Sequence, residues 1–173
     1  MSSLRLTTTS YAVLGLLEQC QPATPYQLKQ VAQISIFHFW TIPHTQLYTE
    51  CARLAEAGLL AEEREETGRR RRTYRLTPTG LEALDGWRSS PNTELYELRD
   101  PGLLKLFCGA DPATLAASEL ERHEQRLALY DQLAREDEQM PEGMRLALQA
   151  GRGHEREYVR FWSGLLSREG PAN

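Results

Sequence analysis

The sequence has little cysteine and no long apolar run. Its 173 residues include only three cysteines, Cys20, Cys51 and Cys108, which are widely spaced and stand beside apolar residues. An odd, scattered set excludes a disulfide framework and predicts buried free thiols in a reducing cytoplasm. No apolar run approaches the roughly 20 residues of a membrane span, and we find no basic leader with a cleavage site. We therefore expect a cytoplasmic protein that does not enter a membrane.

Patterns typical of metal sites and catalysis are also missing. The histidines have no metal-ligand spacing among themselves or with the cysteines; they are His38, His44, His123 and His154. No glycine-rich phosphate loop follows a predicted strand, and no nucleophile elbow is present. The carboxylates fall in charge-mixed runs such as residues 135–139 rather than singly in apolar settings. We expect neither an enzyme nor a protein with a metal or other cofactor.

The chain also lacks an excess of basic residues, since its net charge is −4. This argues against a protein that coats nucleic acid without selectivity. The charge is unevenly distributed. Residues 1–90 contain ten Lys and Arg and nine Asp and Glu, whereas residues 91–173 contain ten Lys and Arg and fifteen Asp and Glu. A nearly neutral first part and an acidic second part are typical of a site-specific DNA-binding protein with a separate partner module.

The most informative stretch runs from Pro43 to Leu76. Its first part predicts a helix, because apolar residues recur at i, i+4, i+7 and i+8; they are Leu47, Cys51, Leu54 and Ala55. The opposite face carries hydrogen-bonding side chains, with an aromatic residue on its flank: Thr45, Gln46, Thr49, Arg53 and Tyr48. Such a polar face can read base edges in the major groove of DNA.

Directly after this helix, a turn at Gly58 leads into a predicted β-hairpin. Its second strand supplies four consecutive arginines, Arg69, Arg70, Arg71 and Arg72. A polar helix followed by a basic hairpin is the layout of a winged helix-turn-helix, in which the wing lies along phosphates. Alternatively, the arginines pair across the hairpin with its glutamates, namely Glu62, Glu63, Glu65 and Glu66. Both interpretations remain open from the sequence.

The flanking segments supply the remaining helices of this fold. A helix is predicted from about Thr8 to Gln19, with Thr8 or Thr9 as its N-cap. The next begins at Pro25 with a capping box formed by Thr24 and Gln27, and it directs Gln27 and Lys29 outward. Thr77 and Pro78 begin a fourth helix. The polar run 89–92 then marks a boundary, so we expect a winged helix-turn-helix over residues 1–90 and a helical domain over 91–173.

The second part predicts two long helices. One extends from Pro112 to about Gln139 and has a coiled-coil-like seam of Leu120, His123, Leu127, Tyr130 and Ala134. The last helix has its own seam of Ala147, Gly151, His154, Tyr158, Phe161 and Leu165, widened by Trp162 and Leu166. This surface is wider than one neighbouring helix needs, so it predicts a dimer. The predicted dimer residues are His154, Tyr158, Phe161, Trp162 and Leu165.

Several segments together resemble the PadR family of transcriptional regulators. They are YAVLGLLEQ, PYQLKQVAQ, FWTIPHTQLYTECARLAEAGLL, GRRRRTYRLTPTGLEAL and, more loosely, HEREYVRFWSGLL. The resemblance implies a homodimeric repressor with a winged-helix DNA-binding domain, a helical dimerisation domain and, in some members, a small aromatic effector. The DNA-facing positions that follow are Gln27, Lys29, His44, Thr45, Gln46, Tyr48, Thr49, Arg53 and Arg69 to Arg72. Pro25 and residues 44–46 depart from the family's usual glycines, so no operator sequence can be carried over.

The sequence leaves alternatives open for the aromatic residues, for the seam histidines and for the function as a whole. Phe39 and Trp40 either belong to the core or help to form a pocket for an aromatic ligand, and Trp162 either packs in the dimer or lines that pocket. His123 and His154 are either packing residues or a source of pH sensitivity in an interface. In place of a specific regulator bound to double-stranded operator DNA, the chain could be a winged-helix adaptor that binds a partner protein.

Overall fold

The computed structural model describes residues 5–36, 39–64, 71–92, 95–136 and 140–167. The chain forms two compact units, which we call the first unit (residues 1–94) and the second unit (residues 95–173). Arg69 and Arg70, which the sequence assigns to the wing, lie outside the described residues, as do Glu65, Glu66 and His38. DNA binding by the first part of the chain and dimerisation by the second stay predictions.

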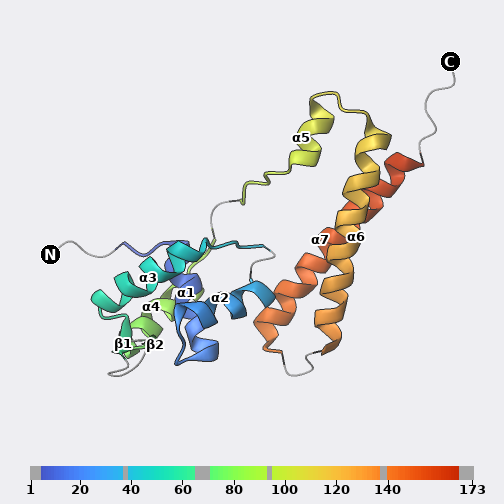
Figure 1. Ribbon diagram of the computed structural model, residues 1–173. Coiled ribbons are helices and arrows are strands. Elements are labelled where there is room, and N and C mark those ends of the chain that lie inside the picture. The colour runs from blue at the N-terminus through green and yellow to red at the C-terminus, as the bar shows by residue number, and fades with distance from the viewer. Residues whose placement is uncertain (1–4, 37–38, 65–70, 93–94, 137–139, 168–173) are drawn as a thin grey trace, which may run out of the picture. The chain divides into compact units, whose positions relative to one another are not determined.

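The first unit is a winged helix. In chain order, three helices precede a two-stranded hairpin and a fourth helix follows it, as can be traced in Figure 1. They are α1 (Thr8–Cys20), α2 (Pro25–Ile34), α3 (His44–Glu56), β1 (Leu60–Arg64), β2 (Arg72–Leu76) and α4 (Pro78–Arg88). This confirms the predicted fold class, mainly helical with a small β-hairpin wing.

Threonine caps begin three of these helices. Thr24 and Gln27 form the predicted capping box of α2, and the Thr77 side chain accepts a hydrogen bond from the backbone of Gly80 in α4. For α1 the prediction of Thr8 or Thr9 is wrong by one or two residues, because Thr7 is the N-cap and Ser10 completes its capping box. Because Ser10 is fully buried, its hydroxyl is also available to neighbours inside the protein.

The core of the first unit joins all its elements. It gathers apolar side chains from α1, α2, α3, β2 and α4, including Leu14, Leu28, Leu47, Leu54, Tyr74 and Leu84. The predicted apolar face of α3 is confirmed. On the other helices, Tyr26 and Leu81 are exposed. Trp87 of α4 is 44% exposed and stacks on Tyr11 at a centroid distance of 4.8 Å.

The wing is fixed to the helices at its base. The hairpin pairs Leu60 with Leu76 at one end and Arg64 with Arg72 at the other. Tyr74 also exchanges two backbone hydrogen bonds with Ala23, of 2.9 and 3.1 Å. At the junction with α4, a Cβ atom on Gly80 would overlap the backbone carbonyl oxygen of Leu59. Only glycine therefore allows α4 to begin this close to the wing.

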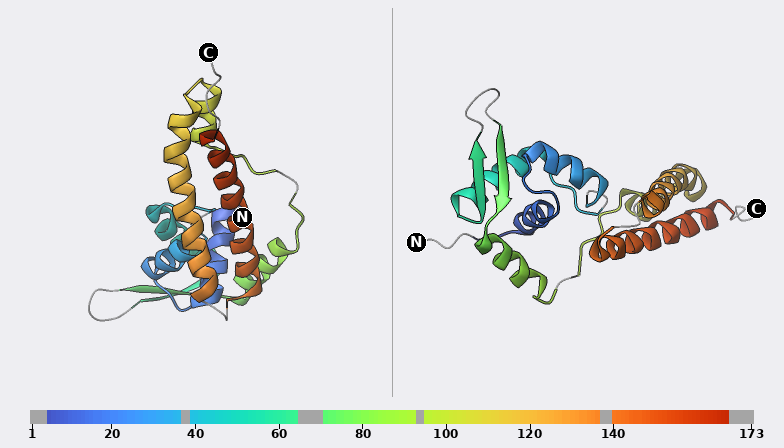
Figure 2. Two further views of the ribbon diagram at one scale, coloured as in Figure 1. Left: turned by 90° about the vertical axis from the view of Figure 1, so that its right-hand side faces the viewer. Right: turned by 90° about the horizontal axis from the view of Figure 1, so that it is seen from below.

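The second unit consists of α5 (Pro101–Phe107), α6 (Pro112–Glu136) and α7 (Glu142–Leu166). In both Figure 1 and Figure 2, α6 and α7 lie side by side along most of their length. At their crossing, Gly151 of α7 packs on the Tyr130 ring, which is 3.1 Å from the position of a Cβ atom. None of the helices in the described ranges is long and apolar enough to cross a membrane.

The predicted seams of the second unit are only partly correct. Tyr130, Gly151 and Tyr158 do pack between the helices, but Ala134 and His154 are exposed and Phe161 is 39% exposed. Instead, Glu155 and Trp162 are buried. Glu155 lies 2.5 Å from Nδ1 of His123 and 3.8 Å from Arg126 of α6. A search for apolar repeats misses this row because its central residue is a charged side chain that gains partners only in the folded pair.

Candidate nucleic-acid interface

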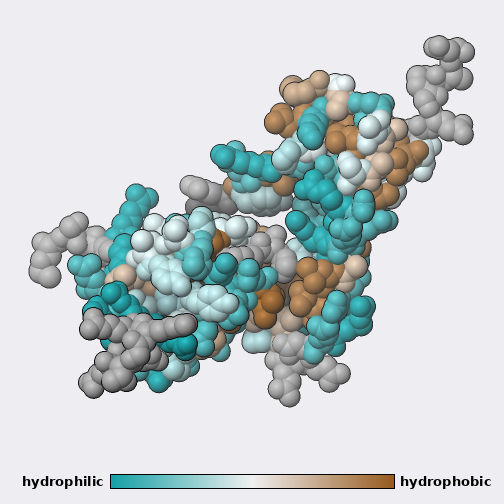
Figure 3. All heavy atoms as spheres, viewed as in Figure 1, coloured by the Kyte–Doolittle hydropathy of each residue, from teal (hydrophilic) through white to brown (hydrophobic). Residues whose placement is uncertain are grey.

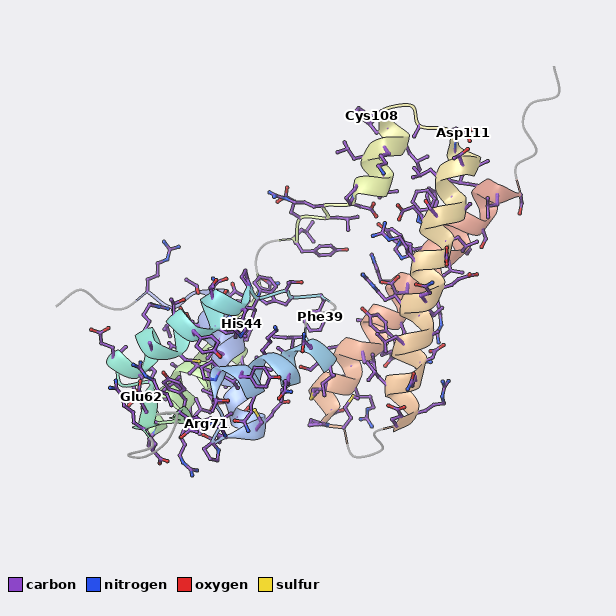
Figure 4. The ribbon with its side chains drawn as sticks, in the orientation of Figure 1. Phe39, His44, Glu62, Arg71, Cys108 and Asp111 are labelled. Atoms are coloured by element: carbon purple, nitrogen blue, oxygen red, sulfur yellow. The ribbon has the colours of Figure 1, made fainter. Side chains whose placement is uncertain are left out.

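The outer face of α3 is a row of exposed polar side chains. His44, Thr45, Gln46, Tyr48 and Thr49 are all exposed. The His44 and Tyr48 rings meet edge to face at 4.8 Å, and Figure 4 shows His44 at the start of the helix. The row therefore offers hydroxyl, amide, imidazole and phenol groups to a ligand outside the protein.

Some of these groups already have intramolecular partners. The Thr49 hydroxyl donates to the backbone carbonyl of Thr45 at 3.0 Å, an ordinary bond for a threonine on a helix. The Gln46 amide donates to the Thr9 hydroxyl of α1 at 3.4 Å. This hydrogen bond from the Gln46 side chain is long and exposed, so Gln46 can exchange Thr9 for a base or a phosphate.

The two residues expected from α2 are less open. The Gln27 side chain accepts hydrogen bonds from the backbone N–H of Thr24 at 2.9 Å and from its hydroxyl at 3.0 Å. Its carbonyl oxygen is therefore engaged in the helix cap, which leaves its amide N–H₂ for an external partner. Lys29 is half-buried. Gln27 is nevertheless exposed, so a DNA contact stays a prediction for both residues.

Arg53 is placed differently from its neighbours on α3. The sequence predicts a DNA contact, but its guanidinium turns toward α1. It donates from Nε to Glu50 at 2.9 Å, from Nη2 to Glu50 at 2.5 Å and to the Ser10 hydroxyl at 2.9 Å, and from Nη1 to the carbonyl of Arg5 at 3.3 Å. All three nitrogens thus have acceptors within the protein.

Glu50 is the anionic partner in this network and is itself buried. Burial by itself raises the pKa of the Glu50 carboxyl, but hydrogen bonds from Arg53 and Ser10 and the charge of Arg53 outweigh it, so that the pKa is lowered. The neighbouring Cys51 thiol has a pKa raised to about 12, chiefly by burial and then by the charge of Glu50. The predicted buried free thiol is confirmed at Cys51, whereas Cys108 is exposed.

The wing combines paired and open arginines. Figure 4 labels Glu62 and Arg71 on the hairpin. Glu62 pairs with Arg64, lies 3.7 Å from Arg72 and accepts a hydrogen bond from the Tyr74 hydroxyl at 3.1 Å. The hydrogen bond from Arg64 is the main cause of the lowered pKa of Glu62. Arg71 is exposed and has no ion pair with another described residue.

The arginine run thus contains a paired residue and an exposed one, and a phosphate contact of Arg71 stays a prediction. Arg72 pairs within the wing, as cross-strand charge pairing predicts, while Arg71 is open. Arg64 and Arg75, which are not among the predicted DNA contacts, are also exposed basic side chains on the same hairpin. Arg75 lies 3.4 Å from Glu63. The sequence did contain a signal for them: Arg64 lies two residues after Glu62 and Arg75 two residues after Thr73, so each shares a face of its strand with a polar residue.

The candidate ligand residues fall into two groups. Phe39 and Trp40 of the first unit are 62% and 41% exposed, so the interpretation of these two as core residues is wrong. Trp162 of the second unit is fully buried, and its ring lies 3.1 Å from the position that a Cβ atom of Gly102 would occupy. It therefore packs α7 against the first turn of α5 within its own unit.

The sequence of the first unit matches a known family. Residues 13–86, from α1 to α4, match the profile of the transcriptional regulator PadR-like family. The match covers most of the first unit. It confirms for this part of the chain the resemblance seen in the sequence, and the family is one of transcriptional regulators.

Comparison with individual proteins extends the similarity to both units. The negative transcriptional regulator PadR of Bacillus subtilis (strain 168) is 25% identical over 175 residues, which cover 91% of this chain and 94% of the relative. The structure of B. subtilis PadR in complex with operator DNA superposes with a TM-score of 0.80 and 21% identity, over 93% of this chain and 98% of that one. The structure of the same protein with p-coumaric acid gives 0.72 and 23%, over 91% and 93%.

Proposed function

We propose that this PadR-like protein is a homodimeric repressor that binds double-stranded operator DNA in the cytoplasm and is released by a small aromatic effector. The observation that carries the proposal is the exposed polar face of α3 beside the basic wing. In a winged helix this arrangement suits one helix in the major groove and a hairpin along the adjacent backbone. The structure of B. subtilis PadR with operator DNA supports the same use of the fold.

Each part of the interface has a chemical role in this proposal. Thr45 and Gln46 donate to base edges or phosphates, because an amide and a hydroxyl are suited to both. His44, Tyr48 and Thr49 border them on the same face. Arg71 contacts phosphate, with Arg69, Arg70 and Arg72 as the further basic residues of the wing. Each phosphate contact makes affinity fall with salt.

We assign dimerisation to the second unit. Its exposed large apolar side chains include Leu104, Phe107, Leu129 and Phe161, and Figure 3 shows hydrophobic residues gathered at both ends of this unit. Exposed apolar surface of this kind marks protein contacts. On α7, the proposed interface residues are His154, Phe161 and Leu165, with Tyr158 behind them. Trp162 supports this face from within the unit.

The effector is the third part of the proposal. The negative regulator of B. subtilis has a structure with p-coumaric acid, and this chain exposes Phe39 and Trp40 on the segment before α3. An aromatic acid that stacks on these rings would act by changing the angle between the two reading helices. Half-site spacing is set by the pitch of DNA, so a small change of angle releases one half-site.

The decisive experiment measures specificity and salt dependence together. Fluorescence anisotropy would follow the purified protein on a duplex from upstream of its own gene and on a scrambled duplex, at several salt concentrations. We expect tighter binding to the upstream duplex by about 10³-fold or more, with affinity that falls steeply with salt. Equal binding to both duplexes, and to fragments selected from the whole genome, would contradict the proposal and favour a protein-binding adaptor.

The oligomeric state is tested independently. Phe161→Ala should shift the protein from dimer to monomer in sedimentation velocity, because it removes an aromatic side chain from the proposed interface. Tyr26→Ala is the matched control, since Tyr26 is an exposed aromatic residue of the first unit. A Phe161→Ala protein that remains dimeric at nanomolar concentration would remove this part of α7 from the interface.

A further inference from the structure

The contacts of Arg53 point to a role other than the one its position on α3 suggests. A DNA-contacting arginine needs donors that face outward. Here the guanidinium side chain is only 33% exposed, and the Glu50 side chain is 10% exposed. Since every guanidinium nitrogen already has an acceptor within the protein, and the positive charge is balanced by Glu50, Arg53 has little left to offer to a phosphate.

We infer that Ser10, Glu50 and Arg53, which we call the Arg53 clamp, are positioning residues that fix α3 in the one orientation that reads the operator. This inference rests on the proposed function. Arg53 and Glu50 stand one helical turn apart on α3, and Ser10 belongs to the first turn of α1. The clamp therefore joins the reading helix to a helix whose packed residues are distant in sequence.

The core alone fixes α3 less strictly than the clamp does. Leu47, Cys51 and Leu54 hold the helix by apolar contact, which is non-directional and tolerates small rotations. Hydrogen bonds require alignment of donor and acceptor, and those between charged groups are the strongest. The two hydrogen bonds of Arg53 to Glu50 and its hydrogen bond to Ser10 therefore restrict the rotation of α3 relative to α1. A reading face must be held within about 0.5 Å to make its base contacts.

Ser10 is the residue that gives the clamp its fixed point. Its hydroxyl accepts from the backbone N–H of Thr7 at 2.8 Å as part of the α1 capping box, and from Arg53 at 2.9 Å. It is completely buried, so it cannot touch DNA itself. A binding effect of Ser10→Ala could therefore reach DNA only through α3.

Glu50→Gln separates a phosphate contact by Arg53 from the positioning of α3, because the two roles predict opposite changes in affinity for the operator. If Arg53 contacted phosphate, the loss of a neighbouring negative charge would strengthen binding to all DNA. The clamp predicts the opposite for the operator: affinity should fall about tenfold, as for the loss of one good base contact, while affinity for scrambled DNA stays the same. The salt slope should not change, because no phosphate contact is lost.

The experiment measures the ratio of the dissociation constants for scrambled and upstream duplexes. The proteins are wild type, Glu50→Gln, Arg53→Lys and Ser10→Ala, each checked for helix content by circular dichroism. Arg88→Lys is the control, because Arg88 of α4 forms a similar fork with Glu18 of α1, and its other ion pair is with Asp85 of its own helix. We expect the ratio to fall in the three clamp variants and to equal that of wild type in the control.

The outcomes separate a loss of the clamp from a loss of folded protein. Partial unfolding lowers the active fraction equally on both duplexes and leaves the ratio unchanged, so Ser10→Ala decides the matter if Glu50→Gln folds poorly. An unchanged ratio in Ser10→Ala and Arg53→Lys, or tighter operator binding by Glu50→Gln, would overturn the clamp while the proposed function stands. A wild-type ratio near one would overturn both.

Discussion

The two units of this protein are stabilised in different ways. The first unit has an apolar core to which both the helices and the hairpin contribute side chains. In the second unit the fully enclosed apolar cluster is much smaller, formed by Leu115, Ala116 and Trp162. Its long helices are joined also by polar contacts, such as the hydrogen bond between His123 and Glu155 and the ion pair of Arg152 with Asp131.

This difference suggests a division of labour. Apolar burial supplies most of the stability of a small domain, so the first unit should be stable by itself. The second unit leaves Leu95, Tyr96, Leu104 and Phe107 exposed and has more to gain from a partner. We infer that dimerisation contributes directly to the stability of the second unit, while the first folds independently of it.

The largest test of this contrast is Trp162→Ala. Removal of a fully buried tryptophan should lower the free energy of unfolding of the second unit by about 3–5 kcal/mol. The remaining tryptophans, Trp40 and Trp87, both lie in the first unit, so their fluorescence reports that unit alone. During urea unfolding, helix content measured by circular dichroism should fall well before the fluorescence changes. Coincident transitions at the wild-type midpoint would show that the two units do not unfold separately.

Gly80→Ala tests the rigidity of the first unit. The new methyl group meets the carbonyl of Leu59, so the free energy of unfolding should fall by about 3 kcal/mol, the upper range for overpacking. Gly86→Ala on the same helix is the control, since nothing lies within 4 Å of its Cβ position; it should gain about 0.5–1 kcal/mol. Equal effects of the two substitutions would mean that the wing can move away from α4.

At high pH, the second unit should lose stability through Tyr158. Burial, followed by the nearby Asp100 carboxylate, raises the pKa of its hydroxyl from 10.0 to about 12. Because the folded state holds this proton more tightly, the stability that it contributes is complete below pH 10 and is lost between pH 10 and about 12. Tyr158→Phe should remove this loss in thermal melts that follow the second unit. A melting profile unchanged by the substitution would contradict it.

At low pH, the first unit should lose stability through Glu50. The lowered pKa of this carboxyl means that its contribution is complete above its ordinary value of 4.5 and is lost as the pH falls below that value through the folded pKa. Glu50→Gln should flatten the acid limb of the stability profile measured by tryptophan fluorescence. Equal acid limbs in both proteins would show that other carboxylates govern it.

The smallest expected effect concerns the wing. Arg71→Ala should weaken binding to every duplex and reduce the slope of log affinity against log salt by about 0.9, the value for one lost phosphate contact. Arg64→Ala is a matched control on the same hairpin, because Arg64 is already paired with Glu62. A larger change of slope in Arg64→Ala than in Arg71→Ala would reverse the assignment.

Local patterns in the sequence were sufficient for much of the first unit. The helix caps at Thr24 and Thr77, the apolar face of α3 and the basic hairpin depend on residues within a few positions of each other, and they define the winged helix. The seams of the second unit were less predictable. Their apolar spacing indicated two packed helices, but the buried Glu155 owes its place to His123 and Arg126 of the other helix.

Only the tertiary structure decided how individual side chains are used. It turned Arg53 inward, exposed Phe39 and Trp40, and enclosed Trp162 behind α5. Arg53 and Ser10 are 43 residues apart in the chain, so the spacing of residues along α3 could not predict the hydrogen bond between them. The sequence by itself determined which faces are polar, basic or apolar, because these follow from local periodicity. Which of those groups remain free depends on partners that folding brings together from distant parts of the chain.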